Sequence, residues 1–354
     1  MNARKIIVPV LFMALSVGLL TGPLASAQQP DQKSPQQVFI PKEVKADIQE
    51  GLASRQGRQD IPFTIFQSLY LPARENFHIT FFMKINNSDL GFAPAAAAPE
   101  GTTSGPQETA FQEAPAELQA NFNVFIQFNR LDKNGVPEIF REAYVPATIM
   151  LPAADADKED VYSVGYPLPA GDYVVAIAVT SLDLQKVGIA YHEFSLPDVT
   201  QFTKNLDTTP IFFVKQIDQM EAAEAKTTLH RGLFTYAILK IVPNLDRVFT
   251  AGENLDIFFF IFGAKSNSSQ QYEIEIDFEV KKGEEMQIKF SPQTYTTPMI
   301  SQPLPMKQTV KIKKGEEERI EQRDLPAGSY TLVINMTDKV SQSTGVKTID
   351  FEVK

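Results

Sequence analysis

The sequence contains no cysteine and no tryptophan, and only three of its 354 residues are histidine. Without a thiol the chain has no disulfide, no cysteine nucleophile and no zinc–thiolate site. Nothing after the N-terminal segment is apolar over enough residues to form a membrane-spanning helix. The fold must therefore be stabilised by burial of apolar side chains, and a chain of this length can bury two cores.

The first 27 residues have the layout of a secretory signal peptide. Arg4 and Lys5 precede an apolar stretch, and cleavage is expected after Ala27 in the small-residue run Ala-Ser-Ala. The alternative is an uncleaved membrane anchor, but the stretch is shorter than the ~20 residues that span a bilayer. We expect an exported protein, periplasmic or secreted, with no membrane insertion after signal removal.

The mature chain is acidic. Loss of Arg4 and Lys5 with the signal leaves 31 basic and 43 acidic residues, a net charge of −12. Binding to phosphate depends on clustered Lys and Arg, so this charge argues against a nucleic-acid partner. The expected partner is another protein or an envelope polymer, and no cofactor is indicated.

One short motif occurs twice. The sequence LPAGDY at 168–173 is matched by LPAGSY at 325–330, and an apolar, strand-like run follows each copy. Proline fixes φ and glycine permits a left-handed turn, so the chain can pass from one sheet to another. The tyrosine would bury its ring and bond its hydroxyl to upstream backbone, as in a tyrosine corner, whereas the alternative is an ordinary Pro-Gly turn. The predicted corner residues are Pro169, Gly171, Tyr173, Pro326, Gly328 and Tyr330.

From residue 61 onward the hydrophobic pattern has a period of two, as in half-buried strands. Residues 77–85, 122–128 and 272–280 are clear examples. Helical periodicity is scarce, although Val44, Ile48 and Leu52 predict one short amphipathic helix. Many short strands between turns predict an all-β fold of two tandem antiparallel β-sandwich domains, of the immunoglobulin or fibronectin III type.

Composition sets the expected domain boundaries. Residues 28–59 form a disordered or short helical N-terminal segment, and residues 91–118, rich in Ala, Pro and Gly, form a flexible insertion. The first sandwich is expected at 60–197, a partly ordered linker at 198–239, and the second sandwich at 240–354.

The second copy of the motif carries a family resemblance. Residues 243–249 (PNLDRVF) lead into Gly252-Glu253-Asn254-Leu255 and an aromatic strand, and the copy ends in the Pro-Gly-Tyr corner. This pattern resembles the tandem immunoglobulin-like tail modules of secreted bacterial proteins of the von Willebrand factor A-related type. The chain lacks the N-terminal domain of the longer members and any Asp-x-Ser-x-Ser motif, so metal-dependent adhesion is not implied.

Candidate catalytic residues are few. His78, His192 and His230 form no metal-binding or metalloprotease pattern, and no Gly-x-Ser-x-Gly elbow is present. These histidines are expected to be exposed or half-exposed strand residues.

The strongest metal candidate is an acidic stretch at 155–160. Its carboxylates Asp155, Asp157 and Asp160 would supply oxygen ligands to calcium. The alternative is a solvated acidic loop, since Lys158 lies within the stretch and no EF-hand glycine is present.

A second acidic pattern runs along one strand, from Glu273 to Glu279. Carboxylates two residues apart on one face repel each other. We expect a neighbouring strand that carries Lys311 and Lys313 to relieve this repulsion without any ligand.

The strand at 257–262, IFFFIF, is apolar on both faces, whereas a strand with one wet face should alternate. We expect the even-numbered face to be core and the other face to be covered by residues 198–250 or by the sister domain. The alternative is a surface for a partner protein formed by Phe258, Phe260 and Phe262.

These observations predict an exported, non-catalytic structural or interaction protein that binds another envelope protein or polymer. Two alternatives remain open. A carbohydrate-binding protein requires a row of exposed aromatic rings, and an enzyme acting on glycans requires two converging carboxylates.

Overall fold

Strands make up most of the chain, and the all-β fold class is confirmed. The computed structural model describes residues 40–95, 117–198, 200, 202, 205–314 and 317–354. The predicted signal, its cleavage site at Ala27 and most of the insertion expected at 91–118 lie outside these residues. Contacts keep Val38–Lys354 together as one unit.

Two sheets, here called the N-terminal sheets, enclose a first core that draws side chains from both. Phe81 and Phe122, one from each sheet, are almost completely buried in it. The first sheet has the order β1 (Phe63–Ala73), β2 (Asn76–Asn86), β6 (Glu159–Leu168) and β11 (Leu229–Arg231). The second has the order β3 (Ala93–Pro94), β4 (Glu117–Leu131), β7 (Gly171–Ser181) and β8 (Val187–Leu196), and β5 (Pro137–Pro152) also pairs with β4. Short 3₁₀ turns occupy Asn87–Leu90 and Ala153–Asp155.

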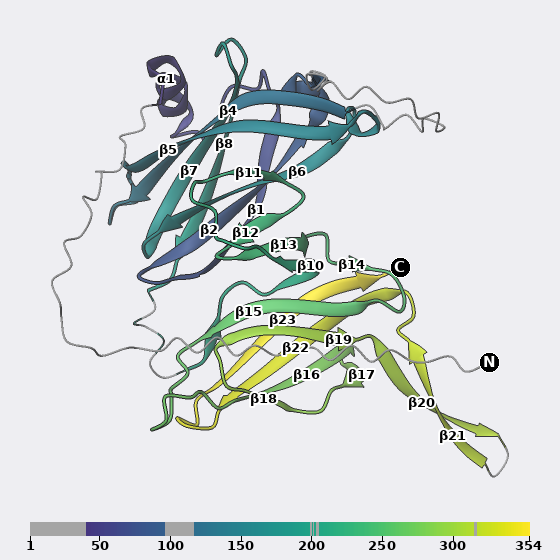
Figure 1. Cartoon of the computed structure of the whole chain (residues 1–354). Coiled ribbons are helices and arrows are strands. Elements are labelled where there is room, and N and C mark those ends of the chain that lie inside the picture. Colours follow the sequence, from purple (N-terminus) through teal and green to yellow (C-terminus); the bar gives the residue numbers. More distant parts are fainter. Residues whose placement is uncertain (1–39, 96–116, 199, 201, 203–204, 315–316) are drawn as a thin grey trace, which may run out of the picture. The chain divides into compact units, whose positions relative to one another are not determined.

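Two further sheets, the C-terminal sheets, enclose a second core. One has the order β12 (Phe234–Tyr236), β13 (Leu239–Asn244), β10 (Phe212–Gln219), β15 (Asn254–Phe262) and β19 (Met299–Pro305), and β9 (Asp207–Thr208) also pairs with β15. The other has the order β14 (Val248–Phe249), β23 (Thr344–Val353), β22 (Gly328–Asp338), β16 (Ile274–Lys282) and β17 (Glu285–Lys289), and β18 (Gln293–Tyr295) pairs with β16. Strands β20 (Lys307–Lys314) and β21 (Glu317–Asp324) form a separate two-stranded ribbon (Figure 1).

Helix α1 (Lys42–Gly51) forms where the four-residue spacing predicted it. Val44 and Ile48 pack against Phe125, Ala176 and other small or apolar residues on the face of β4 and β7 that points away from the first core. The helix therefore covers an apolar sheet face that would otherwise be exposed to water.

The segment 198–239 differs from the linker that we expected. It contains β9, β10, β11 and β12, and its strands belong to both pairs of sheets. β11 pairs with β6 of the N-terminal sheets, whereas β10 lies between β13 and β15 of the C-terminal sheets. The sequence after Gln219 concealed β11 and β12, because a strand of three residues has too few residues to show a period.

The two LPAGxY motifs adopt the same geometry. The Tyr173 hydroxyl donates to the Pro169 carbonyl at 3.1 Å, and the Tyr330 hydroxyl donates to the Pro326 carbonyl at 2.7 Å. Gly171 and Gly328 have φ of 149° and 154°, which favours glycine at both positions. Each tyrosine ring also stacks on a phenylalanine of the following strand, Phe194 in the first copy and Phe351 in the second.

Strand β15 is apolar on both faces, and both are buried or half-buried. We expected the even-numbered residues in the core, but the structure places the odd-numbered residues there. Odd-numbered Ile257, Phe259 and Ile261 belong to the second core. Even-numbered Phe258 is 1% exposed, and its ring lies 5.5 Å from that of Phe212 on β10. Phe258 belongs to a cluster with Phe212 and Phe234 of the same sheet and with Leu69, Leu71 and Phe82 of the N-terminal sheets. The N-terminal sheets therefore cover this face, which is one of the two covers that we expected for the opposite face.

The other residues of the even-numbered face also contact rings of the same chain. The Phe260 ring lies 5.9 Å from that of Tyr236, and the Phe262 ring stacks on Phe202 at 5.2 Å. The contacts of the surface considered for a partner protein are thus intramolecular in this structure.

The acidic strand β16 is neutralised differently from our expectation. The strand with Lys311 and Lys313 is β20, which pairs with β21 and not with β16. The lysines that approach β16 are others. Lys289 lies 3.1 Å from Glu279, and Lys339 lies 2.6 Å from Glu275. Glu279 and Glu275 are therefore paired with a lysine of strand β17 and with the lysine that follows β22, and not with those of β20.

Candidate functional site

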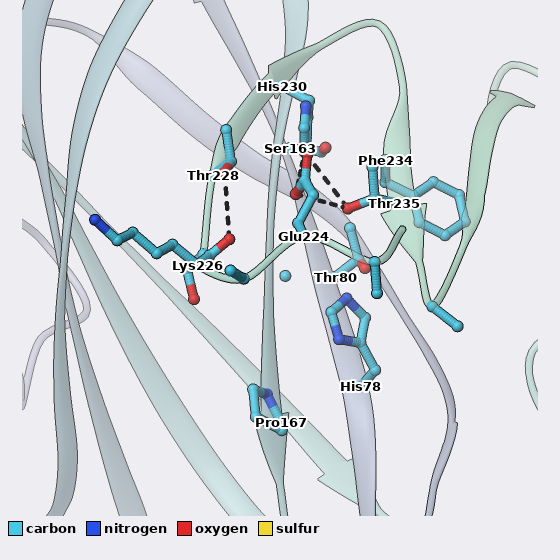
Figure 2. Close-up of a pocket in the computed structure, with 15 residues that line it drawn as sticks. His78, Thr80, Ser163, Pro167, Glu224, Lys226, Thr228, His230, Phe234 and Thr235 are labelled. Carbon is cyan, nitrogen blue, oxygen red and sulfur yellow. Dashed lines mark hydrogen bonds and ion pairs between the residues drawn. The ribbon is translucent and has the colours of Figure 1, made fainter. Parts of the chain in front are cut away.

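A pocket of about 370 Å³ lies on the face of β2 and β6 that points away from the first core (Figure 2). Along β2, core residues alternate with His78 and Thr80, and along β6 they alternate with Ser163 and Gly165. The remaining walls come from the loop around Glu224 and from β11 and β12. The period of two therefore places polar groups on this face, and the returning segment turns the face into a pocket.

His78 lines the pocket without a hydrogen-bond partner among the described residues. Burial lowers the pKa of its imidazole from the usual 6.5, and nearby Glu224 opposes that shift. The ring is therefore neutral near pH 7, with one donor and one acceptor nitrogen. A Cβ on Gly165 would lie 2.3 Å from its Nε2, so residue 165 must be small for the ring to adopt this position.

Thr80 is the most unusual polar residue of the pocket. It is 0% exposed, and its hydroxyl has no hydrogen-bond partner in the structure. Leaving a buried hydroxyl unpaired costs about 1–3 kcal/mol, which makes an orphaned group at the wall of a pocket a feature that requires explanation.

Glu224 is held at the pocket by two neighbours. Its Oε2 accepts a hydrogen bond from the Thr235 hydroxyl at 3.0 Å and lies 3.1 Å from His230 Nε2. Both contacts involve the same oxygen, and Figure 2 shows the Glu224 side chain directed between His230 and Thr235. The Ser163 hydroxyl, also at the wall, donates to the Leu233 carbonyl at 2.6 Å. Hydroxyls and a single carboxylate thus converge on one space.

The acidic stretch proposed for calcium is arranged around a guanidinium group. Arg231 Nη2 lies 2.6 Å from Asp155, and Arg231 Nε lies 2.7 Å from Asp160. Hydrogen bonds from Lys158 and Arg231 lower the pKa of the Asp155 carboxyl, while Asp157 is exposed. Within the part of the chain that the structure describes, no group of three acidic or histidine side chains is placed to hold a metal ion. The three aspartates are therefore not brought together, because Arg231 occupies the position between two of them.

The structure also brings together a serine and a histidine that the sequence did not connect. Ser68 Oγ lies 3.0 Å from His192 Nε2. Ser68 belongs to β1 and His192 to β8, so the contact joins edge strands of the two N-terminal sheets. Burial lowers the pKa of His192, and its ring lies beside the neighbouring rings of Phe81 and Phe194. Its place at the seam between two sheets favours a structural role.

The aromatic residues do not form a sugar-stacking row. Among the described residues, the large exposed aromatics are Phe66 at 37% and Tyr144 at 40%. Lys84 covers the Phe66 ring at 5.2 Å, and Tyr144 stacks on Phe125, its partner on the neighbouring strand β4. Phe66 and Tyr144 lie on strands of different sheets, so they do not form a row on one sheet face.

No helix in the described ranges has the length and apolarity needed to cross a membrane. Comparison of the sequence with known protein-family models gives no match, and a search of curated proteins finds none with significant similarity. The pocket geometry is thus the main basis for a functional hypothesis.

Sequence reasoning missed the pocket because its walls are far apart in the chain. Residue 78 and residue 224 meet only when the segment after β10 returns to the N-terminal sheets. One signal was available: His78 and Thr80 occupy the polar side of a strand whose next even position, Phe82, is apolar. That change from polar to apolar along one face indicates that something covers it.

Proposed function

We propose that this chain is an exported, non-catalytic binding protein, in which two β-sandwich modules form a rigid frame and the pocket beside His78 takes up another envelope component. The two modules are of immunoglobulin-like type, in keeping with the resemblance to tail modules of secreted bacterial proteins. Support for the tandem arrangement comes from the matched corners at Tyr173 and Tyr330. Support for export comes from the pattern of residues 1–27.

The observation that carries the binding role is the buried Thr80 hydroxyl without a partner. Polar groups inside folded proteins are almost always paired, and a ligand is one means of pairing them. Neighbouring His78 has unused hydrogen-bonding capacity of the same kind. A binding protein keeps such groups ready for its ligand, since preorganised polar groups reduce the cost of association.

The proposal is tested by comparing capture of envelope components by the mature protein and two threonine variants. Thr80→Val removes the orphaned hydroxyl with little change in shape. Thr148→Val removes an exposed hydroxyl on β5 that donates to Asn121, outside the pocket. We expect a component that wild type and Thr148→Val retain and that Thr80→Val loses, identified by mass spectrometry. Equal retention by all three proteins would show that the pocket is not the binding site.

The same eluates test the non-catalytic part of the proposal. The retained component should have the same mass before and after incubation with the protein at 37 °C. A mass change that depends on His78 or His192 would show turnover and overturn this part.

A further inference from the structure

The pocket offers a mixed set of donors and acceptors. The Thr80 hydroxyl can donate one hydrogen bond and accept others, and neutral His78 has one donor and one acceptor nitrogen. Oε1 of Glu224 has no hydrogen-bond partner among the residues that the structure describes, since both contacts of this carboxylate use Oε2. Four further hydroxyl side chains, those of Ser163, Thr227, Thr228 and Thr235, surround these groups. A ligand group that both donates and accepts, such as a hydroxyl, satisfies this set better than one that does only one of the two.

The charge of the lining argues against an ionic ligand. It contains one acidic residue, Glu224, and one lysine, Lys226, and no arginine. An anion would approach the Glu224 carboxylate without an arginine fork to hold it. A cation would find a single carboxylate, one of whose oxygens already interacts with Thr235 and His230.

The polarity and the volume of the pocket further restrict the chemical class and the size of its ligand. An apolar ligand would leave the Thr80 hydroxyl and the His78 nitrogens unpaired, which is unfavourable. The volume of about 370 Å³ lies near the lower end of ligand pockets, so the pocket can accept one small ring but not a long segment.

We infer that the pocket binds an uncharged, hydroxyl-rich ligand of the size of a single sugar ring, held by Thr80, His78 and Glu224. This inference rests on the proposed binding function and names its substrate class. Recognition occurs through hydrogen bonds and not through an exposed aromatic platform, which explains how a chain without tryptophan could bind a sugar. The sugar is either free or the terminal residue of an envelope polymer.

The test is calorimetric titration of the mature protein with a panel of matched sugars. The neutral probes are glucose, galactose, mannose and N-acetylglucosamine, and the charged probes are glucuronate and glucosamine. We expect saturable binding of at least one neutral sugar. Its charged counterpart should bind at least about tenfold more weakly, a difference in affinity that corresponds to one hydrogen bond to a charged or unpaired group. Absence of binding by all four neutral sugars up to about 50 mM, well above a millimolar dissociation constant, would overturn the inference. Preferred binding of a charged probe would also overturn it.

Two variants connect binding to the pocket. Thr80→Val should weaken binding about 5- to 10-fold, the effect of one lost hydrogen bond, without lowering the melting temperature, because the hydroxyl has no partner to lose. Thr228→Val changes an exposed loop residue at the rim, so it tests the pocket even if Thr80→Val fails to fold. Unchanged affinity in both folded variants would place the sugar elsewhere and refute the inference.

The source of the sugar is distinguished by chain length. Tighter binding of an oligosaccharide that ends in the preferred sugar indicates a polymer end, whereas equal binding of the monosaccharide indicates a free ligand. Either result supports the inference. If an envelope component is captured through Thr80 but no neutral sugar binds, the proposed binding function stands and only this ligand class fails.

Discussion

The N-terminal and C-terminal sheets share an internal framework but differ on one outer face. In both, a buried tyrosine closes the turn, and a basic side chain approaches its ring: Arg130 lies 6.0 Å from Tyr173, and Lys282 lies 5.6 Å from Tyr330. Outside the core, β2 presents His78 and Thr80 before Phe82, whereas the corresponding face of β15 is phenylalanine at 258, 260 and 262.

This contrast separates the positions that stabilise both halves from the positions that we propose for binding. The corner residues recur because the same backbone path must be held twice. The outer faces are free to differ, because each needs only to match what covers it. The outer face of β15 is covered by apolar and aromatic side chains, whereas polar residues cover the outer face of β2 only in part and leave a pocket.

The largest change in stability is expected when the phenylalanine rings that join the outer faces of the two halves are removed. Phe82 contacts Phe234 at 5.8 Å, and Phe258 contacts Phe212 at 5.5 Å, within one apolar cluster. Phe82→Ala and Phe258→Ala should each lower the free energy of unfolding by about 3–5 kcal/mol. Urea denaturation measures this, with exposed Phe66→Ala as a control expected to change it by about 0.5 kcal/mol or less. A large effect at only one of the two positions would show that the cluster does not serve both halves.

The two corner glycines provide the next comparison. An alanine Cβ at Gly171 would lie 2.9 Å from Arg130 Nε, and at Gly328 it would lie 3.2 Å from Lys282 Nζ. Backbone strain of about 1–3 kcal/mol is expected at both positions. Gly171→Ala should be the more destabilising in thermal unfolding, because the flexible lysine end can move away more easily than the guanidinium. The reverse order would mean that the two corners are not equivalent.

Removal of the tyrosine hydroxyls should have a smaller effect. Tyr173→Phe and Tyr330→Phe each lose one hydrogen bond to a proline carbonyl and keep the stacked ring. We expect a loss of about 1 kcal/mol for each substitution. Because the two sites share no partner, the double variant should show the sum of the single losses, within about 0.5 kcal/mol. A clear departure from additivity, measured by chemical denaturation, would indicate coupling between the corners.

The smallest expected difference between the N-terminal and C-terminal sheets is in the response of their stability to acid. All three histidines lie on strands of the N-terminal sheets, and burial lowers the pKa of His78 and His192 below 6.5. As the pH falls below 6.5, the histidines of the unfolded chain bind protons before those of the folded chain. The free energy of unfolding therefore decreases with falling pH until the folded histidines are protonated as well. Hydrogen exchange at pH 7.0 and 5.5 should show faster opening of β2 and β8 than of β15 and β22, after correction for intrinsic rates. His78→Gln should reduce the difference, and an equal acid response of all four strands would contradict the assignment.

The sequence predicted the framework more fully than the site. The spacing of Val44 and Ile48 gave the helix, and the alternation after residue 61 gave the all-β class, because each pattern reports on neighbours within one element. The position of Arg231 between Asp155 and Asp160, and the meeting of Glu224 with His78, depend on the path of the segment after β10. That path is set by short strands whose pairing partners are distant in sequence, and local periodicity carries no information about it.

The segment that contains β10 and β11 has an evolutionary consequence. Domains that fold independently can be transferred singly between genes by recombination. Here a break before residue 240 would deprive the second half of β10, which lies between β13 and β15, and would leave β11 attached to the first. The two halves are therefore expected to be inherited and transplanted only as a pair.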